Sequence, residues 1–332
     1  GMSSLASNEG TAIGDFTHAT GTNSYAGAEN ASATGNSSVA LGDHTQAVGN
    51  SSYAGGDHSI SNGLNSVSLG HIDTTNGFAI IALGDSNQSN GANSIAEGQS
   101  NVTASGAASG IALGTGNQSN AANGVAEGTS NIADGTNSIA EGTGNHTIGG
   151  NSAAYGVSNT ATGPSSSALG ANNNAGGSAS FAGGYNNSSA GIGSVALGDT
   201  NAANANASFA GGYNNTANGA GSVALGDTNT TTGTATFAGG NNNQAIGDDS
   251  VALGDVNVST GISSFAGGFN NQSIGDGSIA LGASNIAGGV DSIAEGAGSN
   301  AGATNAIAIG STVVASQANS TAVGAASSAT GV

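Results

Sequence analysis

Hydrophobic and polar residues alternate in short runs along this chain, and the alternation restarts every 14 residues. Each unit opens with S-Φ-A-Φ-G, where Φ is usually apolar, and continues with N-x-A-x-G. Residues 250–254 (SVALG) and 243–247 (NQAIG) are examples of the two halves. We count 23 units, seven up to Ser94 and sixteen from Gly110 on. A fixed short period of this kind is typical of a stacked, solenoidal architecture.

Small residues or Asn occupy positions 1, 3 and 5 of each half-unit, while positions 2 and 4 vary. A period of two predicts a strand of about five residues in each half, with positions 1, 3 and 5 facing inward. The Gly at position 5 predicts the positive-φ corner that ends each strand. A coiled coil of the same seven-residue period is disfavoured, because Gly recurs in every heptad without a Leu or Ile seam. The sequence therefore predicts an all-β, parallel β-solenoid with two short strands per turn and about 23 turns.

The domain organisation follows from the same repeat. Residues 10–332 are expected to form a single body, because the repeat runs through all of them. The preceding residues 1–9 are an N-terminal segment, and their Gly1-Met2 start is typical of a cloning scar. The spacing between units is 16 at one place, which indicates a two-residue insertion near 103–109.

An Asn opens the second half of most units. Stacked turns bring these side chains into one inward-facing column, where amides can hydrogen-bond to each other and to the backbone of the corners. We interpret them as a structural ladder rather than a ligand site: Asn131, Asn145, Asn159, Asn173, Asn187, Asn201, Asn215, Asn229, Asn243, Asn257, Asn271 and Asn285.

The outward positions of the first strand form an apolar stripe, whereas those of the second strand are mostly polar. A stripe of this length exceeds what a soluble monomer normally exposes, so we expect further copies of the chain to cover it. Phe alternates with Gly at these positions, which suggests that a ring of one copy lies over the glycine gap of a neighbour. The predicted interface residues are Val195, Leu197, Phe209, Val223, Leu225, Phe237, Val251, Leu253, Phe265, Ile279 and Leu281.

Composition narrows the possible partners. The chain has no Lys or Arg and 19 acidic residues, so it cannot neutralise nucleic-acid phosphates and is disfavoured at anionic membranes. It has no Cys and no apolar run long enough to span a bilayer. Basic or uncharged partners are the ones that fit this charge.

The repeat S-Φ-A-Φ-G-x-x-N-x-A-x-G closely resembles the head repeat of YadA-like trimeric autotransporter adhesins, as in residues 38–42, 250–254 and 278–282. The resemblance covers about residues 10–324, nearly the whole chain. It implies a left-handed parallel β-roll, three of which associate as a homotrimer through the apolar stripe. It also implies an extracellular head at the bacterial cell surface that attaches to host matrix or cell surfaces and contributes to virulence.

The sequence departs from that family in several ways. It shows no basic neck, no coiled-coil stalk and no C-terminal membrane anchor, so we expect a head fragment, or a secreted or fibre protein with the same repeat. An autotransporter would be anchored in the outer membrane through its full-length form. The absence of cations argues against a collagen-like matrix target.

Catalytic, cofactor and metal sites are not expected. The five His (18, 44, 58, 71 and 146) show neither a repeat phase nor a metal-ligand spacing, so we interpret them as solvated corner residues. Asp43, Asp85, Asp199, Asp227 and Asp255 follow the first-strand Gly, and we expect their carboxylates to accept local backbone N–H groups. Glu97, Glu127, Glu141 and Glu295 stand where Leu is usual, and we expect them to reach solvent.

Three functions remain open at this point. The first is a homotrimeric adhesin head whose ligand is an unidentified host or environmental surface. The alternative is a structural fibre or phage-type tail-fibre segment without a dedicated ligand. A minor alternative is an ice-binding solenoid, which is disfavoured because its outward array should be regular, unlike Gln244, Ile246 and Val258.

Overall fold

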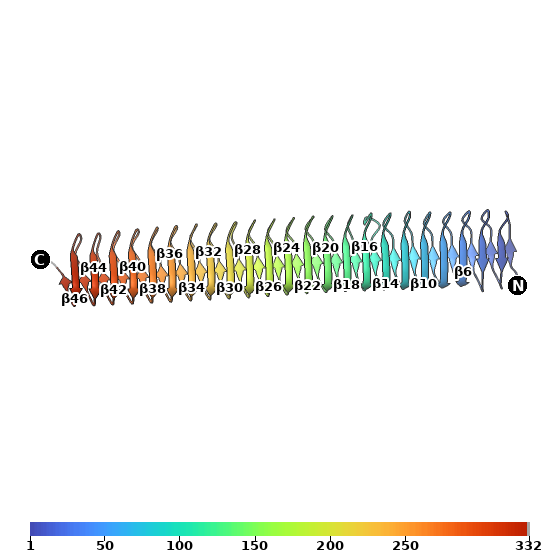
Figure 1. Ribbon diagram of the computed structural model, residues 1–332. Coiled ribbons are helices and arrows are strands. Elements are labelled where there is room, and N and C mark those ends of the chain that lie inside the picture. The colour runs from blue at the N-terminus through green and yellow to red at the C-terminus, as the bar shows by residue number, and fades with distance from the viewer. Residues whose placement is uncertain (331–332) are drawn as a thin grey trace. The chain divides into compact units, whose positions relative to one another are not determined.

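The computed structural model describes residues 1–330, which form β-strands and turns without a helix (Figure 1). It contains two compact units, Gly1–Ser165 and the residues from Ser166 on. Both units repeat the same turn, one long strand followed by one short strand, with 23 long strands in all. The prediction of an all-β, parallel β-solenoid of about 23 turns is confirmed.

The first unit contains eleven of the long strands. They are β2 (Thr11–Ile13), β4 (Tyr25–Gly27), β6 (Val39–Asp43), β8 (Tyr53–Asp57), β10 (Val67–His71), β12 (Ile81–Asp85), β14 (Ile95–Gln99), β16 (Ile111–Thr115), β18 (Val125–Thr129), β20 (Ile139–Thr143) and β22 (Ala153–Val157). The short strands between them are β1 (Leu5–Ala6), β3 (His18–Ala19), β5 (Ser32–Ala33), β7 (Gln46–Ala47), β9 (Ile60–Ser61), β11 (Thr74–Thr75), β13 (Gln88–Ser89), β15 (Val102–Thr103), β17 (Gln118–Ser119), β19 (Ile132–Ala133), β21 (His146–Thr147) and β23 (Thr160–Ala161).

The second unit repeats this order with twelve long strands. They are β24 (Ser167–Ala171), β26 (Phe181–Tyr185), β28 (Val195–Asp199), β30 (Phe209–Tyr213), β32 (Val223–Asp227), β34 (Phe237–Asn241), β36 (Val251–Asp255), β38 (Phe265–Phe269), β40 (Ile279–Ala283), β42 (Ile293–Ala297), β44 (Ile307–Ser311) and β46 (Thr321–Ala325). Its short strands are β25 (Asn174–Ala175), β27 (Ser188–Ser189), β29 (Ala202–Ala203), β31 (Thr216–Ala217), β33 (Thr230–Thr231), β35 (Gln244–Ala245), β37 (Val258–Ser259), β39 (Gln272–Ser273), β41 (Ile286–Ala287), β43 (Asn300–Ala301), β45 (Val314–Ala315) and β47 (Ser328–Ala329).

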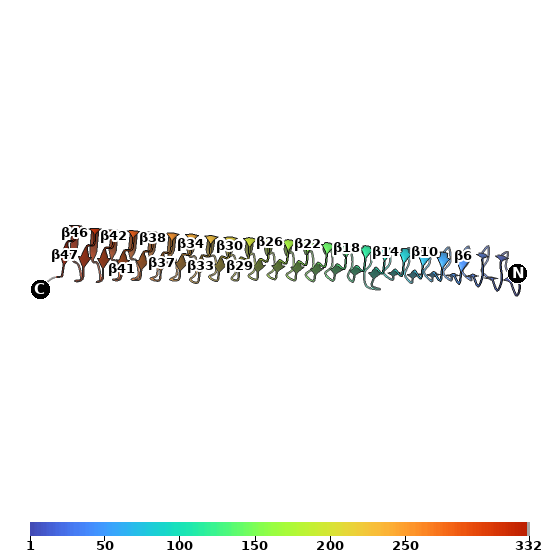
Figure 2. The ribbon, with the colours of Figure 1, turned by 90° about the horizontal axis from the view of Figure 1, so that it is seen from below.

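Within each unit, every strand pairs in parallel with the strand one turn away, at the same position of the repeat. Val195 of β28 lies opposite Phe209 of β30, and Ala202 of β29 lies opposite Thr216 of β31. Figure 2 shows the short strands β29, β33, β37 and β41 in a row of their own beside the long strands. Each unit therefore has two parallel sheets with a core between them.

The second strand of each turn is shorter than predicted, because it holds two residues rather than about five. Where an Asn precedes the strand, one pairing bond goes to a side chain, although strands preceded by Ala31 or Val313 are equally short. The backbone N–H of Asn215 donates to Oδ1 of Asn201 at 2.9 Å, so it leaves the backbone ladder for a side chain. Regular pairing begins only at the next residue, Thr216.

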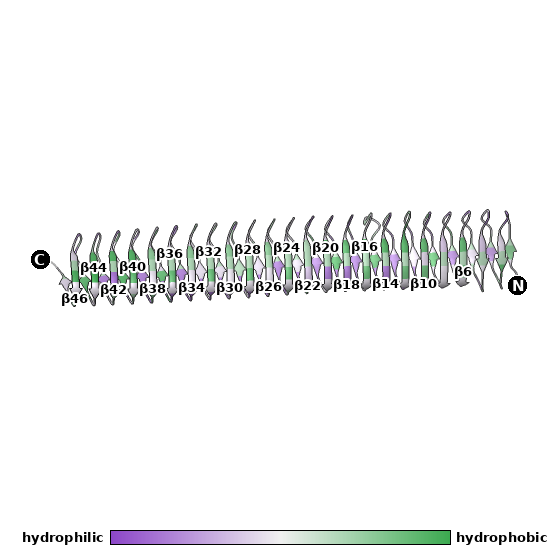
Figure 3. Cartoon of the chain, viewed as in Figure 1, coloured by the Kyte–Doolittle hydropathy of each residue, from purple (hydrophilic) through white to green (hydrophobic). Residues whose placement is uncertain are grey.

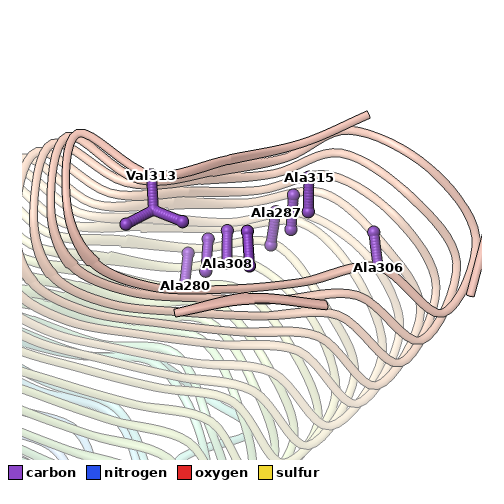
Figure 4. Close-up of a cluster of buried hydrophobic side chains, with 9 residues drawn as sticks. Ala280, Ala287, Ala306, Ala308, Val313 and Ala315 are labelled. Atoms are coloured by element: carbon purple, nitrogen blue, oxygen red, sulfur yellow. The ribbon is translucent and has the colours of Figure 1, made fainter. Parts of the chain in front are cut away.

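The core between the two sheets is one layer of small side chains. Apart from Ile80 and Val313, the buried apolar residues of the described chain are all Ala. Figure 4 shows Val313 and Ala315 on one wall of a turn pointing toward Ala280 and Ala308 on the other. Ser at position 1 is buried as predicted, as in Ser194.

The prediction that the Gly at position 5 faces inward holds for the second half of the unit, where Gly191 and Gly261 are buried, but is wrong for the first strand. Gly198 lies at the exposed bend after Ala196 and Leu197 with φ of 114°, and a Cβ there would collide with the carbonyl oxygen of Gly212 in the next turn. The left-handed corners themselves are mostly made by other residues, such as Thr200 (φ 61°) and Ala207 (φ 54°). These conformations are held by hydrogen bonds between turns, since Thr200 N–H donates to the Tyr185 carbonyl at 2.9 Å.

The two-residue insertion is absorbed in a single corner. Ile95 still lies opposite Ile111 and Val102 opposite Gln118, so both sheets keep their register across it. The extra length forms an additional turn in which Ala107 is fully buried. The insertion therefore changes one loop and leaves the stacking of the first unit intact.

Substitution of the bend glycine tests the close approach of neighbouring turns. We expect Gly198→Ala to lower the free energy of unfolding by about 2–4 kcal/mol, because its Cβ meets backbone that cannot move alone. The matched control is Gly193→Ala, since nothing lies within 4 Å of its Cβ and Ala207 has the same conformation one turn later. The control should change stability by less than about 1 kcal/mol. Equal losses in denaturant unfolding would contradict this account.

Candidate functional site

The outward face of the long strands in the second unit carries a regular series of apolar residues. Figure 3 shows hydrophobic residues, in green, along the long strands. Position 2 alternates Phe with Val and position 4 alternates Gly with Leu, so that Phe209 lies beside Val223 and Gly211 beside Leu225. Leu197 and Leu225 are 37% and 45% exposed. The remaining predicted interface residues are half-buried: Val195, Phe209, Val223, Phe237, Val251, Leu253, Phe265, Ile279 and Leu281.

The glycine gaps of this face are filled from within the same chain, contrary to the expected filling by a neighbouring copy. A Cβ on Gly211 would lie 2.7 Å from Cε1 of Phe209 and 3.2 Å from Cδ1 of Leu225. The ring thus lies over the glycine of its own strand, because residues two apart point to the same side. The same arrangement recurs at Gly183, Gly239 and Gly267, and it smooths the surface offered to a partner.

The corresponding face of the first unit is less apolar. Glu97, Glu127 and Glu141 take the Leu position there and are exposed, as predicted for these residues. Glu127 and Glu141 lie opposite each other on β18 and β20. Like charges on neighbouring strands repel each other and are destabilising. The longer uncharged run of the apolar face therefore belongs to β26–β40, and a shorter one to β4–β12.

The Asn residues form a buried ladder in each unit. Nδ2 of Asn215 donates to Oδ1 of Asn201 (3.0 Å) and to the carbonyls of Gly211 (2.8 Å) and Gly226 (2.7 Å). Its Oδ1 accepts the backbone N–H and Nδ2 of Asn229, both at 2.9 Å. Every polar atom of the amide is engaged, although the side chain is fully buried. The ladder residues are Asn131, Asn145 and Asn159 in the first unit, and Asn173, Asn187, Asn201, Asn215, Asn229, Asn243, Asn257, Asn271 and Asn285 in the second.

The first-unit ladder extends further than predicted, to Asn87, Asn101 and Asn117. These residues occupy the same position of the repeat: Asn117 lies 14 residues before Asn131, and allowance for the two-residue insertion gives Asn101 and Asn87. Asp73 begins the ladder: its Oδ1 accepts the backbone N–H of Asn87 at 2.8 Å and Nδ2 at 3.0 Å.

The other carboxylate oxygen of Asp73 is buried without a partner among the described residues. This oxygen lies next to Gly70, and Nδ2 of Asn87 lies in the same way next to Gly84. At this place in the ladder the Asn amides donate hydrogen bonds to backbone carbonyls. Burial raises the pKa of Asp73, while the hydrogen bonds from Asn87 oppose that shift only in part. A protonated carboxyl can donate at this place, as Asn does, whereas an ionised one cannot.

The His residues all lie in the first unit. His44 and His58 share a position of the repeat, contrary to prediction, and their rings stack at 4.6 Å between centroids. Each Nδ1 lies close to the Asp before it, 2.8 Å for Asp43 and 2.6 Å for Asp57. The hydrogen bond between His71 and Asp85 lowers the pKa of that carboxyl. His18 is exposed, and Nε2 of His146 lies 2.7 Å from Asp134.

The acidic and imidazole side chains of residues 1–330 do not converge on a metal site. No group of three or more His, Asp or Glu side chains could hold a metal ion there, and the described surface has no pocket. The carboxylate oxygens of Asp199 and Asp227 accept the hydroxyls of Thr200 and Thr228, both at 2.6 Å, where backbone N–H donors were expected. No helix in this part of the chain is long and apolar enough to cross a membrane.

Comparison with known proteins identifies the repeat. The family model described as YadA head domain repeat (2 copies) matches residues 8–26, 29–45, 81–101, 245–271, 273–299 and 287–312. Matches fall in both units, so the predicted resemblance is confirmed. No curated protein matches the chain.

Removal of one ladder amide tests how much the column contributes. We expect Asn215→Ala to lower the free energy of unfolding by about 2–5 kcal/mol, because it removes the buried hydrogen bonds that Nδ2 donates to Asn201 and to the carbonyls of Gly211 and Gly226. The assembly state should not change. Circular dichroism melting measures the loss, with exposed Asn218→Ala as the control expected within about 0.5 kcal/mol. An unchanged melting temperature for Asn215→Ala would show that the ladder contributes nothing.

Replacement of Asp73 by Asn tests the state of the buried carboxyl. A folded pKa above the unfolded value means that Asp73 contributes stability fully below its unfolded pKa of about 3.9 and loses it as pH rises through the folded pKa. Relative to Asp73→Asn, the natural chain should therefore lose melting temperature as pH rises from about 4 toward neutrality. Exposed Asp276→Asn serves as the control. Parallel pH profiles for the natural chain and Asp73→Asn would contradict protonation of Asp73.

Proposed function

The repeats of this chain are YadA-like head repeats, a type associated with trimeric autotransporter adhesins, and from this we propose that the protein is the head of a bacterial surface adhesin. In this proposal three copies associate in parallel, and the assembled head attaches to a host or environmental surface. The observation that carries it is the apolar face of β26–β40 on a chain whose repeats match this family.

The apolar face supports self-association. Along eight successive long strands it presents Phe, Val, Ile and Leu at positions 2 and 4, without a charged residue at those positions. Monomeric soluble proteins rarely expose so long a contiguous apolar surface. A second copy of the chain is the simplest cover for this face, because each turn of one copy then contacts an equivalent turn of the other. A three-fold axis closes such contacts into a finite assembly rather than an open fibre.

The remaining surface supports adhesion by many weak contacts rather than by one enclosed site. The described residues form no pocket, and polar residues repeat at the corners of every turn. Repeated contacts on one rigid body gain affinity through effective concentration, and three copies multiply that gain. The proposed function is therefore non-enzymatic, with the protein located at the cell surface or outside the cell.

A charge in the apolar face tests the assembly. We expect the natural chain to have a solution mass near three times the 30.6 kDa of one chain, as measured by light scattering after size exclusion. Leu225→Asp should give monomers, because each copy would have to desolvate a carboxylate at a cost of several kcal/mol.

The matched control is Ile246→Asp, which alters a side chain of similar exposure (40%) next to short strand β35. It should remain trimeric. Dissociation of both variants, or of neither, would be inconsistent with the proposed interface. Adhesion is measured with beads coated with the trimer. If these beads bind to no matrix or cell surface, the result would favour the structural fibre over the adhesin.

A further inference from the structure

A second column of the long strands, at the residue after the bend glycine, has a different chemistry from the apolar face. In the second unit it alternates aromatic and acidic residues, and we name it the aromatic–acid column. Its members are Tyr185, Asp199, Tyr213, Asp227, Asn241, Asp255 and Phe269. They lie opposite one another in order on β26–β38. Strands in a sheet are about 4.8 Å apart, so each ring has a polar group of the column one step away.

The rings of this column are not explained by packing within the chain. Tyr185, Tyr213 and Phe269 are 54%, 55% and 53% exposed, whereas Phe209 is half-buried over a glycine. Large aromatic side chains gain free energy when they are covered. The three exposed rings recur at multiples of 28 residues, which places them on every second turn, or every fourth where Asn241 intervenes.

The carboxylates of the column have no cation to pair with. Asp199 and Asp227 each accept one hydroxyl from the following Thr and are otherwise exposed. The chain has no Lys or Arg, and its five His lie at or before residue 146, in the first unit. Any positive charge near these carboxylates must therefore come from another molecule.

We propose that the aromatic–acid column binds arginine side chains of an extended, basic polypeptide segment of a partner. A guanidinium stacks on an aromatic face and pairs with a carboxylate in bidentate fashion. The column supplies these two groups on neighbouring strands, as with Tyr213 beside Asp199 and Asp227. Lysine fits less well, because its ammonium has neither the planar stacking surface nor the fork of donors.

Charge complementarity selects this occupant over others. The formal net charge of −19 attracts a basic segment and repels nucleic acid. A further copy of this chain would bring like charges together at Asp199, Asp227 and Asp255 without a counter-charge. Each exposed contact is weak, so affinity would come from several arginines bound in a row.

This inference rests on the proposed adhesive function, to which it adds a class of partner, and its test does not require the whole cell. A fluorescent peptide of alternating Arg and Gly, and its Lys counterpart of equal length, are titrated against the purified chain by anisotropy at low and physiological salt. The Arg peptide should bind several-fold more tightly than the Lys peptide. The joint change Tyr185→Ala and Tyr213→Ala should weaken Arg binding about tenfold and remove the preference.

The carboxylates are tested by changing Asp199, Asp227 and Asp255 to Asn together, which should weaken Arg binding by at least about tenfold. The matched control changes Asp248, Asp249 and Asp276 to Asn, which removes the same charge from other corners of the same unit. It should weaken binding less than about threefold. Ile192→Ala, at a side chain 60% exposed, controls for the loss of apolar surface.

Four results would overturn the proposal. Equal weakening by both triple variants would show attraction by bulk charge alone. Equal affinity for the Arg and Lys peptides would exclude the stacking role. Salt-independent binding of a neutral oligosaccharide, lost in the Tyr variant, would assign the rings to a glycan. Dissociation of the oligomer by the Tyr variant would make the column a contact between copies. The solution mass, measured on the same samples, keeps failure of the column distinct from failure of the trimer.

Discussion

Each buried Asn joins three successive turns, and the rest of the structure depends on this bond pattern. Asn215 donates within its own turn to Gly211, to Asn201 of the preceding turn and to Gly226 of the following one. The core beside it is a single layer of Ala. Apolar burial per turn is therefore small, and the hydrogen bonds of one turn are complete only when its neighbours are in place. Stability of this kind is a sum over neighbouring turns, as in other repeat proteins.

The same constraint divides the repeat into positions that packing restricts to small residues and positions that can vary. Inward positions are mostly Ala, Ser, Thr or Asn, because two sheets with a one-layer gap leave little room for larger side chains. Outward positions carry no such limit, and there the period doubles: Phe209 with Gly211 alternates with Val223 and Leu225, and Tyr213 alternates with Asp227. The doubling places the Phe ring and the Leu of the next turn around the glycine between them. Surface chemistry can thus vary while the stack stays unchanged.

Sequence alone predicted the features that follow from the period of the side chains. The parallel long strands, the Ala and Ser core and the inward Asn column are of this kind, since alternation determines which side a residue faces. The features it missed depend on competition among hydrogen bonds. Asn Oδ1 accepts a backbone N–H before many of the short strands, as at Asn215. Corners at Thr200 and Ala207 adopt positive φ because hydrogen bonds to neighbouring turns hold them. Asp73 was missed because its role is visible only beside Asn87.

In the second unit, the apolar positions of a long strand and its charged outward position differ in what they need from their surroundings. Positions 2 and 4 of β30 and β32 are apolar, so covering them removes no charge from water. The next outward column carries Asp199, Asp227 and Asp255, and a chain without Lys or Arg has nothing with which to neutralise them inside an assembly of its own copies. Desolvating unpaired carboxylates is more costly than leaving an apolar edge exposed. In the proposed assembly, the edge of the strands that bears the carboxylates would therefore stay in water, and it is the part of the apolar-faced sheet that we propose a partner contacts.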